Sequence, residues 1–235
     1  MYISQIDEGN ERKTLTEFVT DTIRYNILAG RIVSGEKIKE SIISDELKVS
    51  RAVIREALIR LECEGLIEKQ ANRSANIISF DHKELRDLFE LRRVLEVAAM
   101  ESILDQGLDI SGDLSALLRK LQVQTYQAEK YIDLIRIDID FHRYMVNRCG
   151  NKHIIRSWET LSGQLLVVLY AIGRAKYKQS SELNADMQKT HMPLVAAFRE
   201  KNREKLKEAI ISHIGSGDEA DDAVLTSVLD QGLEL

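Results

Sequence analysis

Hydrophobic residues in the first third of the chain recur at helical spacing in three short stretches. The pattern predicts helices within residues 14–29, 38–47 and 49–66. Ser50 is suited to cap the third helix at its N-terminus, and Gly65 suits a left-handed end. Because the second and third stretches are joined by only a tight turn, we expect a helix-turn-helix.

The pattern then changes twice. Two short β-type runs flank a polar tip that contains Arg73, which predicts a hairpin or wing. From Asp81, which with Glu84 forms a capping box, the pattern favours long helices. We expect them at about residues 82–104, 111–127, 131–149, 152–174, 186–201 and 203–216, with a short tail helix after Asp221.

Taken together, these elements predict a mainly α protein with two domains. Residues 1–80 would form a winged helix-turn-helix, and residues 81–235 an all-α bundle of six or seven helices. Residues 175–185 are polar and predict a loop. Pro193 is expected near the start of its helix or at a kink.

Composition narrows the class of protein. The charged fraction of 30% and hydrophobic fraction of 44% are those of an ordinary globular protein. No apolar run is long enough to span a bilayer and the first residues are polar, so we expect a cytoplasmic protein without a signal peptide or a membrane partner. Cys63 and Cys149 lack metal-type spacing, and we expect both to be buried and reduced.

The third short helix carries candidate nucleic-acid chemistry. Arg51 and Arg55 are four residues apart, on a face that its apolar residues do not use. Guanidinium groups at the start of a short exposed helix suit a guanine edge or a phosphate, although an ordinary arginine-bearing surface is the alternative. The net charge is −5, but residues 48–75 hold six Lys or Arg against four Glu. Such a local excess fits a protein that touches DNA in one place.

The long-helix region carries a candidate metal site. Asp138 and His142 are one helical turn apart, and His191 and His213 lie in later helices. Such a set would hold a divalent transition metal, Zn, Ni, Mn or Fe, with positions left for water or a ligand. Asp140 and Glu182 are rival carboxylates. Taken singly, each histidine is better explained as a surface residue or a hydrogen-bonded core residue than as a metal ligand.

Two sets of motifs resemble a known family. The run VSR…REAL…L…EGL, from Val49 to Leu66, is similar to the winged helix-turn-helix of GntR-family bacterial transcription regulators. The second half resembles the FCD-type effector domain of the FadR-like subgroup. The matching residues are Glu90-Leu91-Arg92, Leu95-Glu96, Asp138, Phe141-His142, Gly150-Asn151, His191 and His213.

The resemblance implies specific sites and partners. DNA would be contacted by Ser50, Arg51, Arg55 and the wing tip near Arg73. A metal at the bottom of a ligand cavity would be held by Asp138, His142, His191 and His213. A homodimer would bind a palindromic operator, and the effector would be a small carboxylate or sugar acid. Arg92 either adds positive charge to the pocket or forms a salt bridge with Glu96.

We therefore expect a ligand-controlled regulator, a repressor rather than an enzyme. One alternative is a metal sensor in which the ion itself is the effector. A further alternative is a metal-dependent hydrolase, since a His/Asp site can activate water. The absence of a general base at motif spacing, and the lack of any role for the first domain, argue against the hydrolase.

Overall fold

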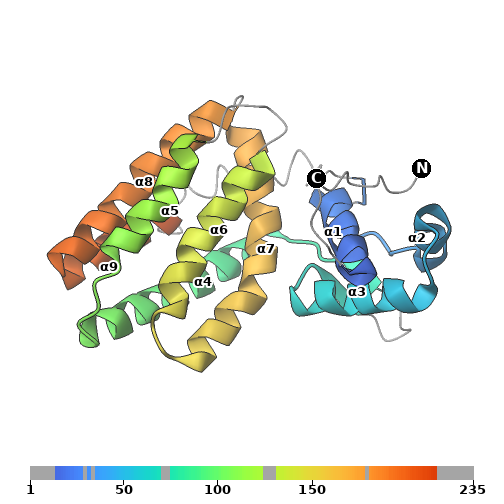
Figure 1. The fold of residues 1–235 in the computed structure, drawn as a ribbon, viewed down its shortest axis with the longest axis horizontal. Coiled ribbons are helices and arrows are strands. Elements are labelled where there is room, and N and C mark those ends of the chain that lie inside the picture. The colour runs from blue at the N-terminus through green and yellow to red at the C-terminus, as the bar shows by residue number, and fades with distance from the viewer. Residues whose placement is uncertain are drawn as a thin grey trace. The chain divides into compact units, whose positions relative to one another are not determined.

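The computed structural model describes residues 14–28, 31–32, 35–69, 75–123, 131–177 and 180–215. Its chain divides into two compact units, and the division falls between Asp81 and His82. The first unit combines short helices with a hairpin, and the second is built from long helices (Figure 1). This is the mainly α fold class that the hydrophobic pattern predicts.

The first unit is a helix-turn-helix followed by two strands. Its elements are α1 (Leu15–Leu28), α2 (Glu40–Leu47), α3 (Arg51–Cys63), β1 (Ile67–Lys69) and β2 (Ala75–Ile77). The strands pair antiparallel, with Glu68 opposite Asn76. The guanidinium of Arg24 in α1 binds both carboxylate oxygens of Glu64, at 2.7 to 3.0 Å, and so ties α1 to the end of α3.

Local signals define the ends of the second and third helices. Lys48 ends α2 in the left-handed conformation, with φ of 55°. The hydroxyl oxygen of Ser50 accepts a hydrogen bond from the backbone N–H of Val53 at 3.4 Å, which caps α3. Gly65 follows α3 with φ of 70°, a conformation that glycine adopts at no steric cost. The cap and the glycine end expected from the sequence are both present.

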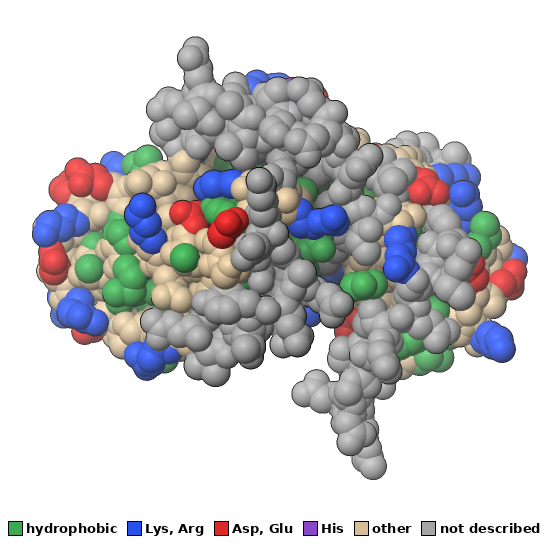
Figure 2. All heavy atoms as spheres, turned by 90° about the horizontal axis from the view of Figure 1, so that it is seen from above, with side chains coloured by type: hydrophobic (Ala, Val, Ile, Leu, Met, Phe, Trp, Pro, Cys, Tyr) green, Lys and Arg blue, Asp and Glu red, His purple; other side chains and the backbone are tan. Residues whose placement is uncertain are grey.

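Six helices form the described part of the second unit. They are α4 (His82–Asp105), α5 (Ser111–Val123), α6 (Tyr131–Asn147), α7 (Lys152–Lys176), α8 (Ser180–Glu200) and α9 (Arg203–Ile214). Trp158, Phe141 and Phe198 are completely buried at the centre of this bundle. On the face drawn in Figure 2, basic and acidic side chains are interspersed over the described surface.

Three expectations need correction. Residues 180–185 are helical rather than a loop, because α8 begins at Ser180. Pro193 lies in the interior of α8 and not near its start, and its missing N–H leaves the carbonyl of Lys189 without its helical partner. Cys149 is buried as expected, but Cys63, at the end of α3, is exposed; both thiols are free.

The wing tip at residues 70–74, with Arg73, and the tail after Asp221 lie outside the described residues. In the part of the chain that the structure describes, no helix has the length and apolar character needed to cross a bilayer.

Candidate metal centre and nucleic-acid interface

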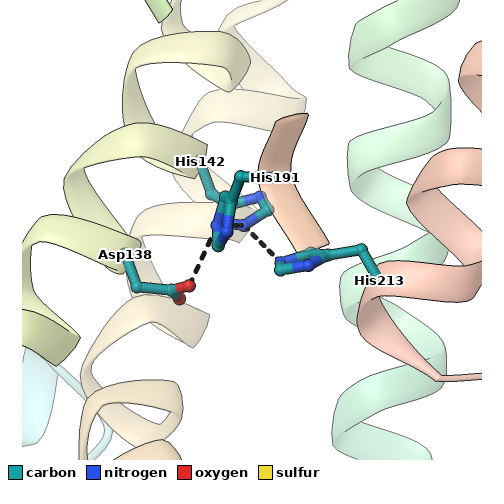
Figure 3. A group of neighbouring side chains, drawn as sticks. All are labelled: Asp138, His142, His191 and His213. Carbon is teal, nitrogen blue, oxygen red and sulfur yellow. Dashed lines mark hydrogen bonds and ion pairs between the residues drawn. The ribbon is translucent and has the colours of Figure 1, made fainter. Parts of the chain in front are cut away.

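Four side chains from three helices converge in the second unit. Asp138 and His142 project from successive turns of α6, His191 comes from α8 and His213 from α9 (Figure 3). Each offers one ligand atom, and these four atoms all lie within 4.8 Å of one another. The structure therefore brings together the four residues that the sequence singled out.

The ligand atoms are close enough to interact directly. Nε2 of His142 lies 3.2 Å from Nε2 of His191 and 2.9 Å from Nε2 of His213. Nε2 of His191 lies 3.1 Å from Oδ1 of Asp138. Asp138, His142 and His191 are buried, and His213 is half-buried. Their polar atoms are thus withdrawn from bulk water and must satisfy one another or a bound species.

The hydrogen bonds made by Nδ1 of two histidines determine the protonation of Nε2, the ring nitrogen that faces the cluster. Nδ1 of His142 lies 2.7 Å from the carboxylate of Glu96, and Nδ1 of His191 lies 2.5 Å from the carbonyl oxygen of Met187. Because both partners are acceptors, each Nδ1 must carry the proton. In the neutral rings each Nε2 then presents a lone pair to the cluster. Lone pairs facing one another at 3.2 Å repel unless a cation is shared between them, and a proton or a metal ion can fill that role.

The ionisation of the site matches this donor set. Burial alone would raise the pKa of Glu96, but the charges of His142 and Arg92 outweigh it and lower that pKa to about 2. The pKa of Asp138 is likewise lowered, because His191, His142 and Arg92 outweigh its burial. Burial lowers the pKa of His142 and, more strongly, that of His213. Charged carboxylates and neutral imidazoles are the forms that bind a metal, and three nitrogens with one oxygen suit Zn, Ni, Mn or Fe.

Glu96 is the centre of a buried network behind the cluster. Besides the hydrogen bond from Nδ1 of His142, its carboxylate accepts hydrogen bonds from Nε of Arg92 at 2.8 Å and from Nε1 of Trp158 at 3.1 Å. The salt bridge expected as one alternative for Arg92 is therefore present. Sequence reasoning gave Glu96 no contact with a histidine and gave Trp158 no role. The only available signal was the spacing of Glu96 from Arg92, which says nothing about His142.

A cavity of about 360 Å³ lies beside the cluster within the second unit. It is lined by Arg92, Asp138, His191 and His213, among other residues. Arg92 therefore also adds positive charge to the pocket, which is the other alternative given for it by the sequence. Three buried atoms of these residues form no hydrogen bond with the described residues: Nη2 of Arg92, Oδ2 of Asp138 and Nδ1 of His213. Nη2 of Arg92 and Oδ2 of Asp138 face each other only as a long ion pair at 3.9 Å. Buried polar atoms normally have partners, so this end of the cavity is prepared for a polar ligand.

The charge of the cavity wall favours an anion. Four basic side chains line it against two carboxylates, and the basic residues are Arg86, Arg92, Arg93 and Lys176. The two carboxylates are Asp138 and Asp186. The volume is within the range of small-molecule sites.

Neither rival carboxylate belongs to the cluster. Asp140 points away from it and pairs with Arg143 at 2.6 Å on the exposed face of α6. Glu182 is exposed in the first turn of α8.

The outer face of α3 is the candidate nucleic-acid interface of the first unit. Ile54, Ala57, Leu58 and Leu61 are buried, which leaves Arg51 and Arg55 on the exposed side. Nε of Arg55 lies 3.1 Å from Oε2 of Glu40 at the start of α2, and 66% of the Arg55 side chain is exposed. Two cations are therefore presented to solvent from one helix, with one of them steadied by a neighbouring carboxylate.

Comparisons with known proteins match both units. The model of the gntR family of bacterial regulatory proteins matches residues 15–77, and that of the FCD domain matches residues 87–216. The gluconate operon transcriptional repressor of Bacillus licheniformis is 27% identical over 192 residues, covering 80% of this chain and 77% of the relative. The Nta operon transcriptional regulator of Aminobacter aminovorans is 25% identical over 182 residues, covering 77% and 81%.

Among solved structures, E. coli McbR/YncC is similar in fold. Its TM-score is 0.66 at 18% identity, and the match covers 91% of this chain and 98% of that one.

Proposed function

Because the chain belongs to the GntR family of bacterial regulatory proteins and carries an FCD domain after its helix-turn-helix, we propose that a small organic acid controls its binding to an operator. The protein is a transcriptional regulator of the repressor type found among its relatives. The observation that carries the proposal is the anion-favouring cavity, where three buried polar atoms of Arg92, Asp138 and His213 have no hydrogen-bond partner among the described residues.

Operator binding is assigned to α3 and the wing. Ser50 and the exposed Arg51 and Arg55 stand at the N-terminal end of α3, the part of a recognition helix that enters the major groove. Phosphate contacts would position the helix, while the two arginines read base edges. Arg73 at the wing tip is proposed as a further backbone contact. A homodimer would place two such helices on a palindromic operator.

The effector site is assigned to the cavity of the FCD domain. Asp138, His142, His191 and His213 would hold a divalent transition metal, which when bound supplies open positions for an oxygen ligand. Arg92 presents Nη2 to the same end of the cavity, where it can pair with a carboxylate. A relative named for a gluconate operon is consistent with an acid as the signal. The effector would act through a difference in affinity between DNA-competent and incompetent dimers.

A second candidate is a metal sensor. It is favoured by one observation: the cluster is buried, and Nδ1 of His142 and Nδ1 of His191 are oriented by Glu96 and Met187, which are contacts within the protein that need no acid. In that case the cavity would be incidental.

One experiment separates the two. Metal-loaded and chelator-treated protein are screened by thermal shift against small carboxylates, hydroxy acids and sugar acids, and each hit is tested for its effect on DNA binding. An acid that stabilises only the loaded protein and changes DNA affinity supports the proposal. If metal alone switches DNA binding and no acid stabilises either form, the protein is a metal sensor.

A further inference from the structure

The cavity has a second polar end, away from the metal ligands. A stripe of α8 lines its wall with Asp186, Met187, Thr190 and His191. Because Asp186 precedes His191 by five residues, the two positions are about 7.5 Å apart along the helix axis. Lys176 and Tyr177, at the end of α7, line the cavity together with Asp186. We call Lys176, Tyr177 and Asp186 the distal group.

The distal group is internally paired. The phenol of Tyr177 donates to Oδ2 of Asp186, and Nζ of Lys176 lies 3.5 Å from the same oxygen. Burial and the Asp186 carboxylate raise the pKa of the Tyr177 phenol well above its ordinary value, so the phenol keeps its proton. Oδ1 of Asp186 takes no bond from the described residues. The group therefore offers one carboxylate oxygen as acceptor beside an ammonium donor.

This combination discriminates among the possible far ends of an acid. A second carboxylate has only acceptors and would meet the negative charge of Asp186. An ammonium group has only donors and would meet Lys176 and the other basic residues of the wall. A hydroxyl both donates and accepts, so it can bond Asp186 and Lys176 together. A plain hydrocarbon would remove water from these groups without replacing its bonds.

We propose that Lys176, Tyr177 and Asp186 select effector acids that carry hydroxyl groups at the end remote from the acid group, which is the pattern of a sugar acid. The inference rests on the proposed function, since it assumes that the acid group lies at the Asp138 end. Tyr177 acts by holding Asp186 in place, and Asp186 and Lys176 make the contacts. The apolar wall formed by Leu169 and Ile172 of α7 would pack against the carbon chain between the two ends.

Six-carbon probes of equal length test the selection. Binding of a set of aldonic acids that differ in hydroxyl configuration is compared with hexanoate, adipate and 6-aminohexanoate by calorimetry on the metal-loaded full chain. At least one aldonic acid is expected to bind at least about tenfold more tightly than the three others, the effect of one or two hydrogen bonds. Preference for adipate or 6-aminohexanoate, or no preference, would overturn the inference.

Paired variants assign the preference to these residues. Asp186→Asn and Tyr177→Phe are each expected to remove most of the preference for the aldonic acid over hexanoate. The chain provides a matched control in Tyr144 and Asp113, a phenol–carboxylate pair at 2.5 Å that does not line the cavity. Tyr144→Phe and Asp113→Asn should leave the preference intact. An equal loss in both pairs, or none in either, would show that the distal group does not select the ligand.

The outcomes also separate this inference from its premise. If acetate and hexanoate bind the loaded protein as well as every aldonic acid, the acid site stands and the distal selection fails. If none of the probes binds, acetate included, the proposed effector site fails, and the distal selection fails with it.

Discussion

Oε2 of Glu96 in α4 accepts a hydrogen bond from Nδ1 of His142 in α6 at 2.7 Å, across 46 positions of sequence. Both residues are completely buried. This bond fixes the tautomer of His142 and turns its Nε2 lone pair toward the cluster. A carboxylate behind a metal-binding imidazole also makes the ring a stronger ligand.

Glu96→Gln should therefore weaken metal binding by about 10- to 100-fold, because the amide provides a weaker and uncharged acceptor. The measurement is competition for the metal against a chromophoric chelator. Glu101→Gln, on the same helix and paired with Arg203 at the surface, is the matched control. Unchanged metal affinity in a folded Glu96→Gln protein would mean that Glu96 serves only the packing of Arg92.

Acid should destabilise the metal-free protein in two steps. The pKa values of His142 and His213 lie below their ordinary 6.5, and that of Glu96 lies at about 2 instead of 4.5. For each group the unfolded chain binds more protons, so the free energy of unfolding falls as pH drops. The first loss should begin below about pH 6.5 as the unfolded histidines become charged, and the second below about pH 4.5.

The measurement is urea unfolding of chelator-treated protein across this pH range. His213→Gln should make the first step smaller, since it removes one buried neutral imidazole. The exposed His153, in the first turn of α7, supplies the control substitution His153→Gln. If His213→Gln left the dependence of the free energy of unfolding on pH unchanged below about pH 6.5, this explanation would be contradicted.

Arg51→Ala should cost on the order of 1–3 kcal/mol on the operator and much less on random DNA, because a base contact distinguishes sequences and a phosphate contact does not. The operator is first obtained by selection from a random pool, and both affinities are then measured at one salt concentration. Arg60→Ala, on the last turn of the same helix and paired with Glu56, is the control. Equal losses on both DNAs would make Arg51 a phosphate contact.

Glu40→Gln should release Arg55 and remove a negative charge beside it. Binding to random DNA should then rise several-fold and the ratio of operator to random affinity should fall, since phosphates attract any free cation. Glu36→Gln removes the same charge nearby, where the carboxylate pairs with Lys39 instead of Arg55. If both variants raise random binding equally and preserve the ratio, Glu40 does not position Arg55.

Much of this fold follows from local sequence. The apolar spacing gave the helices, Ser50 and Gly65 gave the limits of α3, and the one-turn spacing of Asp138 and His142 placed both on one face. The local pattern gave the wrong prediction for residues 180–185, which are mostly polar yet helical. They form the first turns of the long helix α8, which buries Leu183 and Met187 against the bundle.

The rest of the site depends on contacts between distant segments. Glu96 meets His142 and Trp158 only because α4, α6 and α7 pack together, and its sequence neighbours contain no trace of either partner. The pairing of Tyr177 with Asp186 escapes prediction for another reason, since the polar composition of residues 175–185 favours a loop. The wing contact of Arg73 and the metal itself stay predictions.

The three histidines of the cluster are far apart in the chain: His142 is 49 positions from His191 and 71 from His213. An ion bound by all of them would cross-link α6, α8 and α9, as disulfides do in proteins from oxidising compartments. Closing loops of this length in the unfolded chain is costly in entropy. In a chain with only two free thiols, such a cross-link could be made and undone by metal supply instead of by oxidation.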